Sequence, residues 1–345
     1  MLKTLDIVGL SWLARQYCMD LGNENNSSMD NKPCPQEAAI KFGSTVLPIF
    51  ISTVVLLSLI GNILVLVILG LYENLKSLTN IFILNLALSD LIFTLGLTIW
   101  ACYLIWSWTV GGFICKGISF VFSAGFYSSI VFLTLMSIEC YVAVVHPLSD
   151  WNRCQSFPVI PIIAWVVSFS AALPDLVISK ASPDPTDPNK YDCDYTSITA
   201  ALGVIYEQNI FLVVAFSVMS FCFIRILLTI IKAQTKKKHR TVRLIFCMVV
   251  VSFESWAPYN IVVFLQTLAY YPIDPLTQCG VSDHLDYAFH LCRLLAVSHC
   301  CVNPVIYIFA SKKARNHLKA LLQKIFLQQT NTEFHQAEIH SYSSM

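Results

Sequence analysis

Residues able to do chemistry are few in this chain, and they form no catalytic group. The sequence contains no nucleophile elbow, no phosphate-binding loop and no pair of histidines at metal-binding spacing, so it argues against an enzyme. The ionisable residue that stands out is Asp90, which lies inside a long apolar run at 79–106. An ionisable group inside a membrane helix is energetically unfavourable and therefore marks a functional candidate. The plainer alternative is a polar patch that holds neighbouring helices together.

The elements around Asp90 are predicted to cross a membrane. Of 345 residues, 56% are hydrophobic and only 12% are charged, whereas soluble domains are about 25% charged. A helix needs about 20 apolar residues to span the hydrocarbon, which offers the backbone no hydrogen-bond partner. We therefore predict an all-α membrane protein, a seven-helix bundle, rather than a soluble protein with a large core. The expected helices are 46–71, 79–106, 115–142, 158–179, 203–231, 242–268 and 284–310.

Loop charges predict the orientation. The loop before the sixth run is basic, through Lys236, Lys237, Lys238 and Arg240, whereas the loops on the other side carry acids. Because basic loops stay in the cytoplasm, the N-terminus is expected outside and the C-terminus inside. The net charge of +1 gives no reason to expect nucleic acid as a partner. We therefore divide the chain into four segments: an extracellular tail at 1–44, the helical domain at 45–310, an amphipathic helix at 311–326 and a disordered tail at 327–345.

The segment at 311–326 has apolar residues along one stripe and basic residues along the other. It is expected to lie on the cytoplasmic face of the membrane, in contact with lipid. On the opposite side, Asn25 and Asn26 begin two overlapping glycosylation sequons, which agrees with an extracellular N-terminus. Four of the 13 cysteines also fall outside, where disulfides persist: Cys34, Cys115, Cys193 and Cys279. Four cysteines allow three pairings, and the residues alone do not choose among them.

Motifs in nearly every run, in order across residues 45–325, resemble the rhodopsin-like G-protein-coupled receptors. They include Gly61-Asn62, Asn85-Leu-Ala-Leu-Ser-Asp90, Trp165, Trp256-Ala-Pro258-Tyr259 and Asn303-Pro304-Val-Ile-Tyr307. The resemblance implies a seven-helix receptor in the plasma membrane. It also implies that Asp90 belongs to a polar cluster able to hold a sodium ion that favours the inactive state. The members of this cluster are Asn62, Asp90, Ser129, His299 and Asn303. No other cofactor is expected.

The same resemblance assigns residues to a conformational switch. Proline inside a helix removes a hydrogen bond and permits a kink, which suits a hinge. Trp256 is expected at the floor of the ligand pocket, where plain core packing is the alternative role. The implied switch residues are Glu139, Cys140, Tyr141, Phe223, Trp256, Pro258, Pro304 and Tyr307. The basic residues Lys236, Lys237, Lys238 and Arg240 are the implied contacts to a G protein.

Within this class, the runs at 237–246 and 298–304 resemble chemokine receptors in particular. That family implies disulfides Cys115–Cys193 and Cys34–Cys279, and a basic extracellular chemokine as ligand. An acidic outer surface would steer such a ligand inward. Most of the family has glutamate at the position of Arg293, whereas the branch that binds XC chemokines has arginine there, as this chain does. The implied ligand-binding residues are Trp100, Phe122, Asp194, Tyr195, Tyr259, Gln266 and Arg293.

The chain departs from the family at the end of its third helix. The expected Asp-Arg-Tyr reads Glu139-Cys140-Tyr141, and Phe223 replaces a tyrosine that supports the active state. The resemblance implies an inhibitory-type heterotrimeric G protein and arrestin as partners. The missing arginine makes weakened coupling an alternative, as in an atypical or decoy receptor. Another peptide-binding receptor of the class is a further alternative, whereas a transporter would show inverted repeats or interrupted helices.

Overall fold

The structure is a computed structural model, and it describes residues 37–75, 77–106, 112–147, 159–184, 187–233, 239–270, 279–321 and 323–324. Some predictions therefore lie outside the described residues. They concern the sequon residues Asn25 and Asn26, the half-cystine Cys34 and the loop lysines Lys236, Lys237 and Lys238. The disordered tail at 327–345 lies outside them as well.

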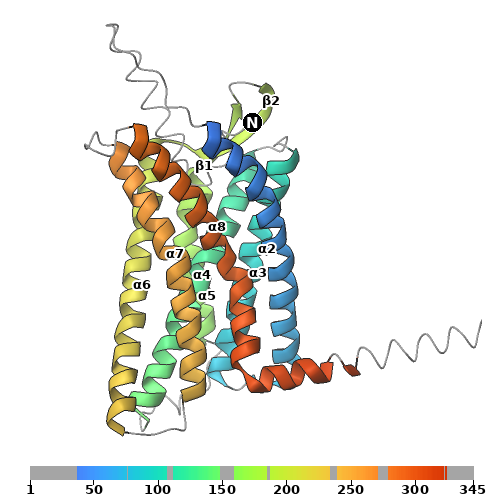
Figure 1. Cartoon of the computed structure of the whole chain (residues 1–345), viewed down its shortest axis with the longest axis vertical. Coiled ribbons are helices and arrows are strands. Elements are labelled where there is room, and N and C mark those ends of the chain that lie inside the picture. Colours follow the sequence, from blue (N-terminus) through green and yellow to red (C-terminus); the bar gives the residue numbers. More distant parts are fainter. Residues whose placement is uncertain are drawn as a thin grey trace, which may run out of the picture.

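Seven helices within the described chain are long and apolar enough to cross a membrane, which confirms the predicted bundle. They run side by side along the long axis of the molecule (Figure 1). Most extend beyond the apolar run that predicted them, because a helix continues past the hydrocarbon. For example, the first helix runs over Glu37–Tyr72, whereas the predicted run was 46–71. The helices are α2 (Glu37–Tyr72), α3 (Leu78–Trp106), α4 (Gly112–Val145), α5 (Val159–Ile178), α6 (Ile198–Ala233), α7 (His239–Tyr270) and α8 (Cys279–Ala310).

Large apolar side chains cover the outside of the bundle. Ile49 on α2, Val213 on α6 and Phe309 on α8 are each at least 65% exposed. A soluble protein would bury such residues, whereas a lipid-facing surface favours them. The interior holds a mixture of apolar side chains and buried polar groups, which are described below.

Two glycines permit close approach between helices inside the bundle. A Cβ atom added at Gly125 would lie 2.5 Å from the backbone nitrogen of Phe93, and one at Gly61 would lie 2.7 Å from Pro304. Both contacts are too short for a side chain, so α4 packs directly on α3, and α2 packs on α8. Trp165 of α5 adds a hydrogen bond from its indole nitrogen to Asn85 of α3, at 2.9 Å.

A two-stranded antiparallel sheet connects α5 to α6 and was not part of the predicted all-α fold. Strand β1 (Ser179–Asp184) pairs with β2 (Asp187–Tyr195), with a register irregularity between Pro183 and Asp184. The sequence at 183–188 reads Pro-Asp-Pro-Thr-Asp-Pro and is thus rich in turn-forming residues. Figure 1 shows this hairpin at one end of the bundle, which we call the hairpin end.

After α8, the chain is helical over 312–321 and 323–324, within the predicted 311–326. This short helix leaves α8 at a steep angle and lies across the end of the bundle opposite the hairpin (Figure 1). Lys313 and His317 of the short helix contact the Glu73 carboxylate at the end of α2, at 2.5 Å and 3.6 Å. Its placement on a membrane surface stays a prediction.

Candidate functional site

A cavity opens between the helices at the hairpin end. Its empty volume is about 590 Å³, including the part open to solvent, which is within the range of ligand pockets. Five of the predicted ligand-binding residues line it, namely Trp100, Phe122, Tyr195, Tyr259 and Arg293. The remaining lining residues are Ser119, Ser123, Phe126, Asp175, Gln208, Trp256, Ala296 and Val297.

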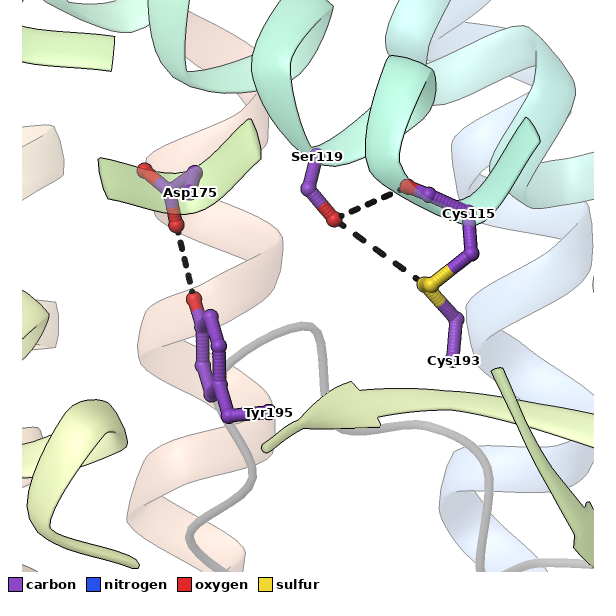
Figure 2. The surroundings of a disulfide bond; sticks show 5 residues. All are labelled: Cys115, Ser119, Asp175, Cys193 and Tyr195. Atoms are coloured by element: carbon purple, nitrogen blue, oxygen red, sulfur yellow. Dashed lines mark hydrogen bonds between the residues drawn. A yellow bond between two sulfur atoms is a disulfide. The ribbon is translucent and has the colours of Figure 1, made fainter. Parts of the chain in front are cut away.

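A disulfide fixes the hairpin over this cavity. Cys115 at the start of α4 bonds to Cys193 of β2, as predicted (Figure 2). The hydroxyl of Ser119, one turn further along α4, donates to the backbone carbonyl of Cys115 at 3.1 Å. Cys193 lies two residues before Tyr195, so the covalent bond also limits where the Tyr195 ring can lie.

One wall of the cavity carries a positive charge. The Arg293 guanidinium of α8 lies over the Trp100 ring of α3, 4.2 Å from the ring centroid, and 5.7 Å from that of Phe289. Arg293 is only 5% exposed, so these ring faces supply much of its surroundings. Trp100 thus holds the cation against the cavity wall.

Another wall carries a negative charge. Asp175 of α5 is 2% exposed, and its Oδ1 accepts a hydrogen bond from the Tyr195 hydroxyl at 3.0 Å (Figure 2). Its Oδ2 is buried and accepts no hydrogen bond from a described residue at normal geometry. Burial raises the pKa of the Tyr195 phenol, and the neighbouring Asp175 raises it further, so the phenol stays a donor.

Asp175 was missed by the sequence prediction, although a signal for it existed. It stands inside the apolar run at 158–179, where an acid is as unexpected as Asp90 is in its own run. What the sequence did not show is that Tyr195, 20 residues later, folds back onto this carboxylate.

The floor of the cavity is an aromatic cluster around Trp256. Its ring lies 4.5 Å from Phe126, 6.0 Å from Phe93 and 5.0 Å from His299, measured between centroids. Tyr259, one turn nearer the hairpin end, completes the cluster at 6.0 Å. Any movement of the Trp256 ring therefore disturbs three other helices.

Below this floor, the predicted polar cluster is assembled around Asp90. Ser129 donates to Asp90 Oδ1 at 2.8 Å, and the Asn303 amide donates to Oδ2 at 2.9 Å. His299 Nε2 lies 3.9 Å from Oδ1, beyond direct hydrogen-bond distance. Asn62 joins through the backbone instead, because its amide donates to the Cys300 carbonyl at 2.9 Å. Side chains of α3, α4 and α8 thus meet at one buried carboxylate, and α2 bonds to α8 beside it.

At the opposite end of α4, the predicted switch residues have another arrangement. Thr79 of α3 donates to Glu139 Oε1 at 2.9 Å, while Glu139 Oε2 is buried and accepts no hydrogen bond from a described residue. Cys140 is buried, and Phe223 packs edge-on against Phe246, with centroids 5.2 Å apart. The hydroxyl of Tyr141 meets His146 Nε2 at 3.1 Å.

The remaining predicted residues are spread over the chain. Pro258 and Pro304 lie inside α7 and α8, and Tyr307 is buried. Gln266 is not among the cavity residues, because its amide donates to Asp286 at 3.3 Å. Asp194 lies in β2, Cys279 begins α8 and Arg240 lies in α7, but their side chains are outside the described part of the structure.

Comparison with known proteins agrees with this geometry. Residues 61–307 match the model of the 7 transmembrane receptor (rhodopsin family). Chemokine XC receptor 1 of Homo sapiens is 41% identical over 302 residues, covering 86% of this chain and 87% of that protein. The Mus musculus receptor of the same name is 42% identical over 296 residues, covering 84% and 87%. C-C chemokine receptor type 4 of Homo sapiens is 37% identical over 298 residues, covering 85% and 82%.

Neither the fold nor these relatives point to an enzyme. The family places the chain in the plasma membrane as a multi-pass protein. It also implies a chemokine and a G protein as the two kinds of partner. The seven spans, the disulfide-anchored hairpin over the cavity and the identity over most of the chain together show that this protein belongs to the chemokine receptors, within the rhodopsin family of seven-transmembrane receptors.

Proposed function

We propose that the chain binds a basic extracellular chemokine of the XC type at its hairpin end. This requires the hairpin end to be extracellular, as the loop charges predict. The observation that carries the proposal is the cavity beneath the hairpin, with Arg293 on one wall and Asp175 on another. The identity to receptors named for XC chemokines supports the ligand class.

Binding is expected to have two parts. The chemokine body rests on the tail and the outer loops, where acids attract a basic partner. Its flexible end enters the cavity, where the Asp175 carboxylate can accept from an ammonium group and the Arg293 guanidinium can donate to a carboxylate or carbonyl oxygen. A cavity with one acidic and one basic side chain favours a ligand end that also carries one positive and one negative or carbonyl group.

The ligand assignment is tested by reversing the charge at Arg293. In Arg293→Glu, affinity for the XC chemokine should fall at least tenfold, because the buried charge then repels the ligand's acidic or carbonyl group. Arg293→Lys keeps the charge but loses the planar group over Trp100, so its loss should be smaller. Competition binding with a panel of chemokines measures both. An unchanged affinity ranking in Arg293→Glu would contradict this role.

We also propose transmission to an inhibitory-type G protein and to arrestin, with Lys236, Lys237, Lys238 and Arg240 as contacts. The specific observation favouring a second candidate is the end of α4. Cys140 lacks the guanidinium that normally engages the G protein, and Glu139 is held by Thr79 of the neighbouring helix. An atypical receptor that captures chemokine with weakened coupling fits this arrangement.

G-protein activation by the XC chemokine separates the two candidates. It should be measured in the native receptor and in Cys140→Arg, at matched surface expression and with chemokine binding as the control. A native response supports the signalling receptor and shows that the arginine is dispensable here. A response in Cys140→Arg alone supports the atypical receptor, while the ligand assignment stands.

Finally, we propose a sodium ion at Asp90. Carboxylate, hydroxyl and amide oxygens suit a hard cation, and Asp90, Ser129 and Asn303 supply one of each. The fit has a structural basis, because Asn303 Oδ1 is buried beside the carboxylate and accepts no hydrogen bond from a described residue. The bound ion would favour the inactive state by holding α3, α4 and α8 together.

A further inference from the structure

The ion pairs at the end of the bundle opposite the hairpin converge on one carboxylate. Glu73 directly follows α2, and its side chain is only 6% exposed. Lys313 Nζ of the short helix lies 2.5 Å from Glu73 Oε2, and His317 Nε2 lies 3.6 Å from Oε1. Asn80 of α3 also donates to Oε2, at 3.4 Å. We call these four residues the Glu73 clamp, which joins α2, α3 and the short helix (Figure 1).

Further contacts fix the direction of the short helix. The Tyr72 ring stacks on that of His317, with centroids 4.9 Å apart, and Lys324 Nζ lies 5.6 Å from the Tyr72 centroid. At the start of the short helix, the Ser311 hydroxyl accepts a hydrogen bond from the backbone N–H of Ala314 at 3.2 Å, as a helix cap does. The short helix is therefore held both at its start and along its described length.

The clamp lies on the same pair of helices as a hinge. α2 touches α8 at Pro304, where a Cβ atom on Gly61 would lie 2.7 Å from the proline ring. Glu73 lies about 18 Å further along α2. Beyond the hinge, the backbone N–H of Ser311 donates to the Tyr307 carbonyl at 3.1 Å, so the short helix follows directly on the last turn of α8. When α8 bends at Pro304, the short helix moves with it while Glu73 stays with α2, and the clamp is pulled apart.

The other acid at this end has no cation beside it. Among the described residues, Glu73 and Glu139 are the acids at this end of the bundle. Glu139 accepts from the Thr79 hydroxyl, and Cys140 beside it carries no charge, so its carboxylate pairs with no described cation. Asn80 of the clamp follows Thr79, so the first turn of α3 connects the two carboxylates. The described ion pairs at this end are therefore those on Glu73.

We propose that the Glu73 clamp is the resting lock of this receptor. While the clamp is closed, it keeps α8 from bending further at Pro304, and this end of the bundle opens only after the clamp releases. Because α7 packs along α8, bending α8 displaces the neighbouring end of α7. The lock takes the place of a charge pair at Glu139, which Cys140 does not provide.

The two partners of the main ion pair differ in exposure, which suits a reversible lock. Lys313 is 65% exposed, whereas the Glu73 side chain is 6% exposed. On release, the lysine keeps most of its water, and the glutamate regains water that it lacks in the closed state. Opening is thus opposed by the ion pair and favoured by solvation of the buried charge. Losing one hydrogen bond to a charged group shifts such an equilibrium about tenfold.

The lock is tested by measuring the distance between the ends of α2 and α7 in the full chain, in lipid nanodiscs. Spin labels are placed at Leu71 and Arg243, whose side chains are exposed, on ketone-bearing unnatural amino acids that leave the native cysteines unlabelled. Double electron–electron resonance gives the populations of closed and open distances. In Glu73→Gln and in Lys313→Ala, the ratio of open to closed should rise about tenfold. Lys313→Arg keeps the cation and should stay near the native ratio, as should Lys312→Ala, the matched control.

A second label separates a lock from a plain anchor. Continuous-wave spectra of a single label at Asn316 report whether the short helix is held or mobile. An anchor without a locking role predicts that Lys313→Ala frees this label but leaves the distances between α2 and α7 at native values, and that result would overturn the proposal. Equal shifts in Lys312→Ala and Lys313→Ala would do so as well.

The double variant Glu73→Gln/Lys313→Ala completes the test. Both changes remove the same contact, so the double variant should shift the ratio no more than either change alone. Shifts that multiply would reveal two unrelated contacts and contradict the lock. Lys313 is largely exposed, so its replacement leaves the packing intact and carries the test even where Glu73→Gln fails to fold. Monodisperse elution of each purified variant verifies folding.

Discussion

The two ends of α4 differ in the charged residues that they hold. At the hairpin end, Cys115 holds β2 over a cavity whose two charges are each supported by an aromatic residue, Trp100 beneath Arg293 and Tyr195 beside Asp175. At the other end, Cys140 stands where the family has an arginine, and Glu139 is held by Thr79 instead. On the proposed function, the end that receives the ligand carries both charged residues, whereas the end that faces the G protein lacks the arginine.

If the proposed function is right, this contrast predicts that ligand capture and G-protein coupling depend on different ends of one helix. Between the two ends of α4 lie the Asp90 cluster and the aromatic floor around Trp256. A change at the hairpin end should therefore alter ligand affinity without restoring coupling, and a change at the other end should leave affinity unaltered. The following predictions test that separation, from the largest expected effect to the smallest.

Removing the disulfide should have the largest effect. The bond closes a 78-residue separation, for which chain entropy predicts about 4–5 kcal/mol of stabilisation. In Cys115→Ser, chemokine affinity should fall at least 100-fold, because the hairpin no longer holds Tyr195 in place. Saturation binding on intact cells measures this. Cys292→Ser on α8, which removes a cysteine outside the disulfide, is the control. Equal losses in both variants would remove the structural role assigned to the bond.

Neutralising the negative wall should come next. In Asp175→Asn, the cavity keeps its shape but loses the charge for the ligand's ammonium group, which predicts about a 10- to 100-fold loss of affinity. Asp286→Asn makes the same change at the hairpin end, outside the cavity lining. Competition binding compares them. Should the two variants bind equally well, Asp175 is a structural partner of Tyr195 only.

The Asp90 cluster should give a smaller, ion-dependent effect. In the native receptor, raising sodium at constant ionic strength should lower affinity for an activating ligand severalfold, because the ion favours the inactive state. In Asp90→Asn, this response should disappear. Lithium or potassium replaces sodium as the control. A sodium response that survives in Asp90→Asn would place the ion elsewhere.

The smallest effect is expected at the signalling end. Thr79→Val removes the hydrogen bond to the buried Glu139 carboxylate, which predicts a loss of about 1–3 kcal/mol in stability. The thermal midpoint of the purified receptor should fall by a few degrees, with chemokine affinity unchanged. Thr98→Val, which removes a bond only to its own helix, is the matched control. A fall in affinity in Thr79→Val would join the two ends that the comparison separates.

The sequence by itself determined the seven spans, because hydrocarbon leaves the backbone no partner and forces each long apolar run into a helix. Through the family resemblance, it also located the Asp90 cluster and five of the cavity residues, because a family motif keeps the same position in the bundle and therefore the same neighbouring helices. The pairing of Cys115 with Cys193 came from the family resemblance, because four outer cysteines alone leave three choices.

The tertiary structure decided what each acid within the membrane spans faces. Asp175 and Glu254 both interrupt apolar runs in the sequence, and neither was assigned a role by a motif, as Asp90 was. Asp175 turns into the cavity because Tyr195 folds back onto it, and Gln266 turns to Asp286 instead of the cavity. Glu254 points to lipid because its flanking residues pack against neighbouring helices. A helix presents residues on every side, and only the packing of its neighbours determines which side is core, cavity or lipid.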